Sequence, residues 1–170
     1  MPQQTVVDRA LGVVRLDFAP AHSQPSALRV GLATVVALAG SLAADALLVL
    51  LGTAVFPSTK GYVHFAFADY SKLTIIGVLI ACAGWPVVTR VTSAPKWMFL
   101  RVAILTTLVL YLPDVYLLVL GDPVRAVLVL MLMHLAIAVV TYNALVRLAP
   151  VGPGPSGPRH GSHRHAGPGG

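Results

Sequence analysis

The chain has 170 residues, of which 56% are hydrophobic and only 11% are charged. A soluble domain usually carries about 25% charged residues, so this composition excludes an ordinary soluble domain. The net charge of +6 does not indicate nucleic-acid binding, because the basic residues lie at the ends of apolar runs. In that position they act as membrane anchors and topology signals.

Four long apolar runs follow one another along the chain, and each is about the length that crosses a hydrocarbon core of roughly 30 Å. The sequence predicts an all-α, four-helix antiparallel transmembrane bundle within residues 27–148. We expect its helices at about residues 30–56, 72–90, 97–120 and 123–147.

The two flanking segments contain little that would fold by itself. Residues 1–26 form a polar N-terminal cytoplasmic segment, and residues 149–170 are rich in Gly, Pro and His. Such a tail buries too little apolar surface to fold, so we predict that it is disordered. His160, His163 and His165 are only weak metal candidates, because no Cys or carboxylate accompanies them. We therefore expect neither a metal nor a cofactor.

The distribution of Lys and Arg predicts the orientation in the membrane. Nine basic residues flank the spans on one side and three on the other, namely Arg9, Arg15, Arg29, Arg90, Lys96, Arg101, Arg147, Arg159 and Arg164 against Lys60, Lys72 and Arg125. Both termini are therefore predicted to be cytoplasmic. The chain lacks Glu and is rich in Ala, Val and Arg, which is typical of a GC-rich bacterial genome, so we expect the bacterial plasma membrane.

Two of the breaks between the runs carry structural signals. Asp122 suits a helix N-cap and Pro123 suits the first helical position, so the third and fourth helices should be antiparallel neighbours. The longer first break is typical of an interfacial aromatic belt, with Tyr62, Phe65, Phe67 and Tyr70.

Three ionisable residues interrupt the apolar runs: Asp45, Asp114 and His134. A charged Asp near the centre of a membrane helix costs roughly 2.5–3.5 kcal/mol, so such residues should face the bundle interior. In the first helix, Ser41 and Asp45 are four residues apart and lie along a face of small residues. Small residues let helices approach closely, so this face is also a candidate for self-association or for contact with another membrane protein.

A second polar stripe is predicted on the third helix, where Thr107, Tyr111 and Asp114 recur at i, i+4 and i+7. Arg125 begins the fourth helix at the same end of the bundle, and His134 lies roughly 14 Å deeper at about 1.5 Å per residue. Depth alone therefore permits an intramembrane polar cluster of Asp45, Asp114 and Arg125, with His134 beneath it.

Two interpretations of this cluster stay open. The leading one is a small, non-enzymatic accessory or structural subunit of the membrane, in which the polar residues fix helix packing. The alternative is a proton-linked translocator or a small-ligand-binding membrane protein that uses Asp114, His134 and Asp45. We expect no enzymatic activity, because no nucleophile is paired with a base in a recognisable motif.

Three segments carry a family resemblance: Arg29–Leu51, Leu112-Pro113-Asp114 and Leu130-Met131-Leu132-Met133-His134-Leu135. They resemble an uncharacterised actinobacterial family of small four-helix integral membrane proteins, a domain of unknown function. The resemblance covers roughly Ala27 to Leu148 and implies a fold and a membrane location, without an activity or substrate. In that family a polar residue such as Asn is common near the Asp45 position, so the acid here is a departure.

Overall fold

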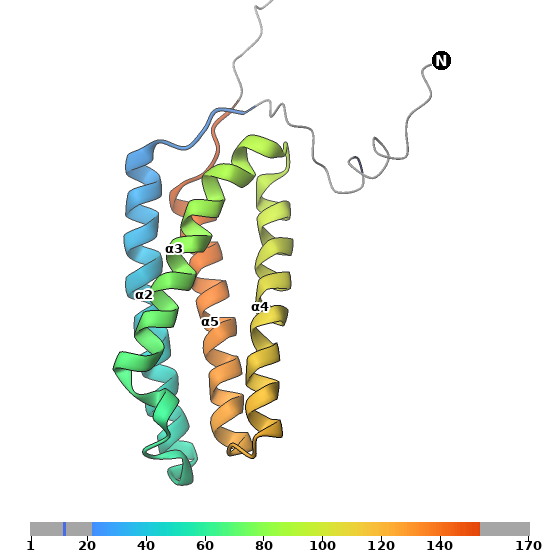
Figure 1. Ribbon diagram of the computed structural model, residues 1–170. Coiled ribbons are helices and arrows are strands. Elements are labelled where there is room, and N and C mark those ends of the chain that lie inside the picture. Colours follow the sequence, from blue (N-terminus) through green and yellow to red (C-terminus); the bar gives the residue numbers. More distant parts are fainter. Residues whose placement is uncertain (1–11, 13–21, 154–170) are drawn as a thin grey trace, which may run out of the picture.

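The computed structural model describes residue 12 and residues 22–153, and it is built from four long α-helices (Figure 1). In chain order the elements are α2 (Ala27–Val55), the 3₁₀ turns η1 (Pro57–Thr59) and η2 (Val63–Phe65), α3 (Phe67–Val91), α4 (Pro95–Val119) and α5 (Val124–Leu148). All four α-helices are long and apolar enough to cross a membrane. The prediction of an all-α fold with four membrane-spanning helices is therefore confirmed.

Two local predictions differ from the structure at the ends of helices. The helix α3 begins at Phe67, about one turn before the predicted start, and Asp69 in its first turn complements the positive end of the helix dipole. Asp122 does not cap α5, whose N-cap is Pro123 with no side-chain hydrogen bond. Asp122 instead accepts a hydrogen bond of 2.9 Å from the hydroxyl of Tyr62, because the turn brings it against the first loop.

The helices α2, α3 and α5 pack together, whereas α4 packs chiefly on α5 (Figure 1). Two glycines of α2 allow its closest approach to α5. A Cβ atom at Gly52 would lie 2.8 Å from a methyl carbon of Val129, and one at Gly40 would lie 2.9 Å from a methyl carbon of Val140. These two contacts set the antiparallel register of α2 and α5, so residues 40 and 140 lie at the same depth.

The bundle interior contains two apolar clusters. One lies toward the end that holds residues 22–26 and 149–153, and it includes Ala33, Ala37, Val78, Cys82, Trp85, Phe99, Ala144 and Leu145. The other lies toward the η1–η2 loop and includes Phe65, Tyr70, Ala126, Val129 and Met133. Phe65 and Tyr70 are each only 8% exposed, so these two aromatic side chains belong to the core and not to the predicted interfacial belt.

Six polar residues lie along the helices between the two apolar clusters, and we call them the polar layer: Ser41, Asp45, Thr74, Asp114, His134 and Thr141. Five of them are buried, and His134 is partly buried. Burial of polar groups between apolar clusters is costly unless they form hydrogen bonds, so a layer of this kind needs a structural or functional reason. The polar layer is therefore the candidate functional site.

The two ends of the described chain meet at one end of the bundle. Ser23 and Gly152 exchange two backbone hydrogen bonds, of 3.2 and 3.0 Å. The hydroxyl of Thr89 donates to the side-chain oxygen of Gln24 at 2.7 Å. The indole nitrogen of Trp85 donates to the carbonyl of Ala149 at 2.9 Å. These contacts hold the segments before α2 and after α5 against the end of α3.

Candidate functional site

The central feature of the polar layer is the pair formed by Asp114 of α4 and His134 of α5. Their side chains meet at 3.0 Å between Oδ2 of Asp114 and Nδ1 of His134. The Asp114 side chain is 5% exposed and that of His134 is 26% exposed. An ionised carboxylate only accepts hydrogen bonds, so Nδ1 of His134 carries the donated hydrogen and Nε2 is left as the second protonation site. Among the described residues, this is the one hydrogen bond between predicted site residues that joins two helices.

Asp45 of α2 binds a different partner. The Thr74 hydroxyl of α3 donates to Oδ2 of Asp45 at 2.6 Å, and Asp45 is completely buried. Within residues 22–153, Oδ1 of Asp45 has no hydrogen-bond partner, and neither have the hydroxyls of Ser41 and Thr141. The α2–α5 register brings Thr141 to the depth of Ser41, so these unpartnered oxygens lie within the same part of the polar layer.

Asp45 and Asp114 have different hydrogen-bond partners, but the protonation state of His134 affects both carboxylates. A positive charge on His134, when it is protonated, would attract the carboxylates of both Asp45 and Asp114. His134 lies ten residues, or about 15 Å, into α5, and Asp45 lies the same ten residues from the end of α2. The imidazole therefore stands at about the depth of Asp45, although Asp45 has its hydrogen bond to Thr74 and only Asp114 has one to His134.

Polar contacts continue from the polar layer toward the η1–η2 loop. Burial raises the pKa of the Tyr62 hydroxyl above its usual range, and the hydrogen bond from this hydroxyl to Asp122 acts in the same direction, as do the charges of Asp122 and Asp114. Tyr62 thus stays protonated and keeps donating at neutral pH. Beside it, His64 and Asp69 form an exposed pair at 2.7 Å, which links η2 to the first turn of α3.

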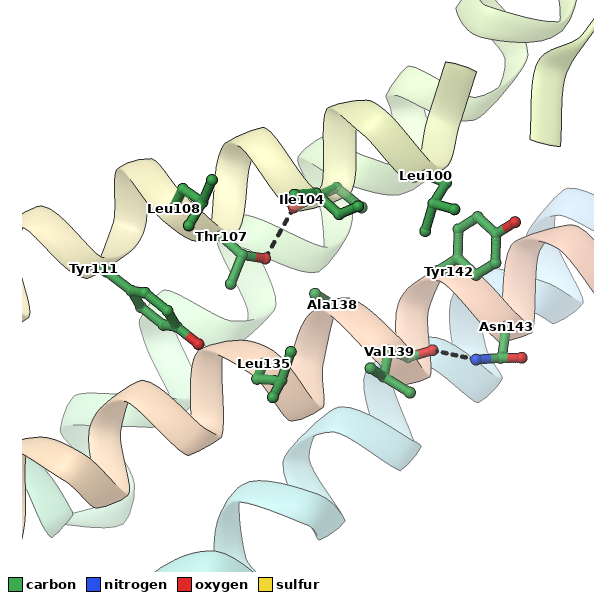
Figure 2. A pocket seen from close by; sticks show the side chains of 11 residues that line it. Leu100, Ile104, Thr107, Leu108, Tyr111, Leu135, Ala138, Val139, Tyr142 and Asn143 are labelled. Atoms are coloured by element: carbon green, nitrogen blue, oxygen red, sulfur yellow. Dashed lines mark hydrogen bonds between the residues drawn. The ribbon is translucent and has the colours of Figure 1, made fainter. Parts of the chain in front are cut away.

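An open groove of about 400 Å³ runs between α4 and α5 on the surface of the bundle (Figure 2). Its walls are mostly aliphatic, with Leu100, Ile104, Leu108, Leu135 and Val139 among the lining residues. Figure 2 shows the ring of Tyr111 extending from α4 toward α5 at one end of the groove, and Asn143 at the other end. Neither Asp114 nor His134 lines the groove, but the Tyr111 and His134 rings meet edge to face, with 6.4 Å between centroids, so Tyr111 stands between the groove and the pair.

Several predicted site residues do not join the cluster. The guanidinium of Arg125 lies over the ring of Phe56, 5.4 Å from its centroid, and no ion pair joins it to a carboxylate within residues 22–153. The hydroxyl of Thr107 donates to the carbonyl of Ala103 in its own helix. The predicted stripe on α4 therefore divides: Asp114 contacts His134, Tyr111 lines the groove, and Thr107 satisfies its hydroxyl locally.

The self-association and metal predictions have different outcomes. Ala33, Ala37 and Ser41 on the small-residue face of α2 are completely buried inside the bundle, so this face is not available to a second copy of the chain.

His160, His163 and His165, the weak metal candidates, lie outside the described residues. Among the residues that are described, no group of three His, Cys, Asp or Glu side chains could hold a metal ion.

Sequence reasoning missed the contribution of Thr74 on α3. A threonine within an apolar run carries no distinguishing signal. Its importance depends on the α2–α3 register, which places it against Asp45. The pairing of Tyr62 with Asp122 was also missed, because sixty positions separate the two residues.

No protein-family model, curated protein or solved structure matches the chain. No family is identified, and the resemblance noted from the sequence stays an expectation. The fold defines the class of protein. Four packed helices, each long and apolar enough to span a bilayer, make this a small multi-pass membrane protein.

Proposed function

We propose that this protein is a non-enzymatic, proton-linked translocator in which the Asp114–His134 pair binds the transported proton. The observation that carries the proposal is the 3.0 Å contact between a 5% exposed carboxylate and an imidazole inside the bundle. Intramembrane ionisable residues are rare and expensive, and they characteristically mark ion pathways and proton relays. Histidine is suited to this role because its charge changes near physiological pH.

The surroundings of the pair support a proton site that is reached from the η1–η2 end. The hydrogen-bonded Tyr62 and Asp122 lie between that end and Asp114. On the other side, Asp45 and Thr74 continue the polar layer, and the apolar cluster around the fully buried Trp85 closes the bundle beyond it. In this proposal a proton enters the polar layer from the loop end, and its passage past Trp85 requires a second arrangement of the helices.

The distribution of Lys and Arg supports an orientation with both termini in the cytoplasm and the η1–η2 loop outside, and the amino-acid composition supports the bacterial plasma membrane as the location. A reporter that is active only in the cytoplasm, fused after residue 170, tests this orientation. Activity of the same reporter inserted in the η1–η2 loop would contradict it.

Proton flux into proteoliposomes tests the function. Purified protein is reconstituted around a pH-sensitive dye, a pH or voltage gradient is imposed, and the rate of internal pH change is recorded. We expect flux in the wild type and its loss in Asp114→Asn, which keeps the shape of the side chain but removes the ionisable group. The matched control is Asp69→Asn, the same change at a carboxylate whose side chain is 46% exposed. Absence of flux in the wild type, or equal flux in both variants, would refute the proposal.

A second candidate is an accessory subunit that binds a larger membrane protein. It is favoured by the arrangement of α4, which packs chiefly on α5 and exposes large apolar residues over its remaining surface, among them Leu105, Leu112 and Val119. Co-purification from native membranes in mild detergent tests it. Recovery of the chain alone, with active proton flux, would favour the translocator.

A further inference from the structure

We propose that the groove between α4 and α5 binds a neutral, lipid-soluble carbonyl compound of the quinone class, with its ring at Tyr111 and its tail along the groove. This inference deepens the proposed function, since the binding site adjoins the Asp114–His134 pair. It concerns binding only and requires no redox step within the protein.

The shape and lining of the groove suit a ligand with a long apolar tail. Its volume of about 400 Å³ falls within the range of small-molecule sites, about 300–1,000 Å³. Leu100, Ile104 and Leu108 of α4 face Leu135 and Val139 of α5 along its length (Figure 2). Polar groups are few along these walls, so the tail that fits the groove is a hydrocarbon or isoprenoid chain.

One end of the groove offers a hydrogen bond that the described part of the protein does not use. The hydroxyl of Tyr111 makes no hydrogen bond to any described residue, although its ring contacts that of His134. A hydroxyl that faces hydrocarbon without a partner is unfavourable. The occupant of this end of the groove should therefore present an acceptor oxygen to Tyr111.

The depth of Tyr111 in the bilayer favours a quinone over an ordinary phospholipid as the ligand of the groove. The helix α4 is about 37 Å long and the hydrocarbon core about 30 Å thick, so with α4 centred each helix end projects about 4 Å beyond the core. Tyr111 lies eight residues, or about 12 Å, before the end of α4, and hence about 8 Å inside the core. Phospholipid ester groups stay at the interface, whereas an uncharged quinone carbonyl enters the core with its ring.

The imidazole of His134 does not line the groove, but its ring lies edge to face with that of Tyr111, which does. Because Nδ1 of His134 is occupied by Asp114, only Nε2 remains for a ligand, and it has no hydrogen-bond partner among the described residues. Neutral His134 accepts a hydrogen bond there and protonated His134 donates one. Binding of a carbonyl group next to this nitrogen would couple occupancy of the groove to protonation of the pair.

Photolabelling in lipid nanodiscs tests the site. The full chain is reconstituted in saturated phosphatidylcholine, labelled with an azido-benzoquinone that carries a decyl tail, and the modified peptides are mapped by mass spectrometry. Unlabelled decyl-benzoquinone and decanol serve as competitors. The variant is Tyr111→Phe, and its control is Tyr116→Phe, the same change on the same helix at a residue that is 61% exposed and does not line the groove.

We expect labelling of groove residues on α4 and α5, competed by the unlabelled quinone and not by decanol. Loss of one hydrogen bond should weaken quinone binding by about three- to tenfold in Tyr111→Phe and leave Tyr116→Phe like the wild type. Equal binding in the two variants, scattered labelling without competition, or equal competition by decanol would overturn the inference. The photolabelling assay applies no pH gradient, so it tests quinone binding independently of proton transport. Intact proton flux in a protein that binds no quinone would refute this inference alone. Absent flux with intact quinone binding refutes only the translocator.

Discussion

The contact between Gly52 and Val129 predicts that a single methyl group at position 52 will loosen the α2–α5 interface. In Gly52→Ala the new Cβ would lie 2.8 Å from Cγ2 of Val129 and 3.2 Å from Cγ1. The first distance is 0.6 Å less than the 3.4 Å at which ordinary van der Waals contact begins (3.4 − 2.8 = 0.6). Val129 cannot easily move its methyl groups, because a β-branched side chain in a helix has one strongly preferred rotamer.

The expected magnitude follows from two opposing effects. Overpacking of a tight interface costs about 1–3 kcal/mol, whereas Ala in place of Gly favours a helix interior by up to about 1 kcal/mol. The matched control is Gly31→Ala in the same helix, where an added Cβ would meet nothing within 4 Å. Since both variants gain the helix propensity, their free energies of unfolding should differ by the overpacking alone, about 1–3 kcal/mol, with Gly52→Ala the less stable.

Steric trapping in bilayers, or unfolding by SDS titration, measures these free energies. Addition of Val129→Ala removes the two methyl groups that clash, so in the Gly52→Ala background it should cost less than it costs by itself. Equal stability of the Gly52→Ala and Gly31→Ala variants would refute the close approach of α2 and α5. Strict additivity of Gly52→Ala and Val129→Ala would refute Val129 as the cause.

Three further experiments on the polar layer have distinct expected outcomes in the same unfolding assay. A double-mutant cycle of Asp114→Ala and His134→Ala should give a coupling free energy of about 0.5–3 kcal/mol, and strictly additive effects would mean that the pair does not form. Thr74→Val preserves shape but leaves the buried carboxylate of Asp45 without its donor, so unfolding should become easier by about 1–3 kcal/mol. Ser41→Ala removes a buried hydroxyl without a partner among the described residues, so the protein should be equally stable or more stable; a loss similar to that of Thr74→Val would contradict the packing around Ser41.

Segment length and depth could be predicted from the sequence because they depend on local properties. Four apolar runs of membrane-spanning length predict four helices, and counting residues along them predicted that His134 could approach Asp114. Depth does not specify the direction in which a side chain points around the helix axis. Arg125 therefore lies over the ring of Phe56, at a depth where a carboxylate partner was expected.

Contacts that depend on the register between helices could not be predicted. The partner of Asp45 is Thr74, which is chemically unremarkable within its apolar run and matters only because α2 and α3 pack at one particular offset. Likewise, Asp122 has the sequence context of a helix cap but accepts a hydrogen bond from Tyr62, because the η1–η2 loop folds back against the turn before α5. Both contacts depend on how distant segments pack, which the local sequence does not specify.

The backbone contact between Ser23 and Gly152 has a consequence for biogenesis. During synthesis the segment before α2 emerges first, and its partner emerges only after α5 is complete. The backbone hydrogen bonds between Ser23 and Gly152 can therefore form only after the last helix has been made. A side chain at position 152 would collide with Ser23, so the glycine there allows the segments on either side of the four helices to pair as a late step of assembly.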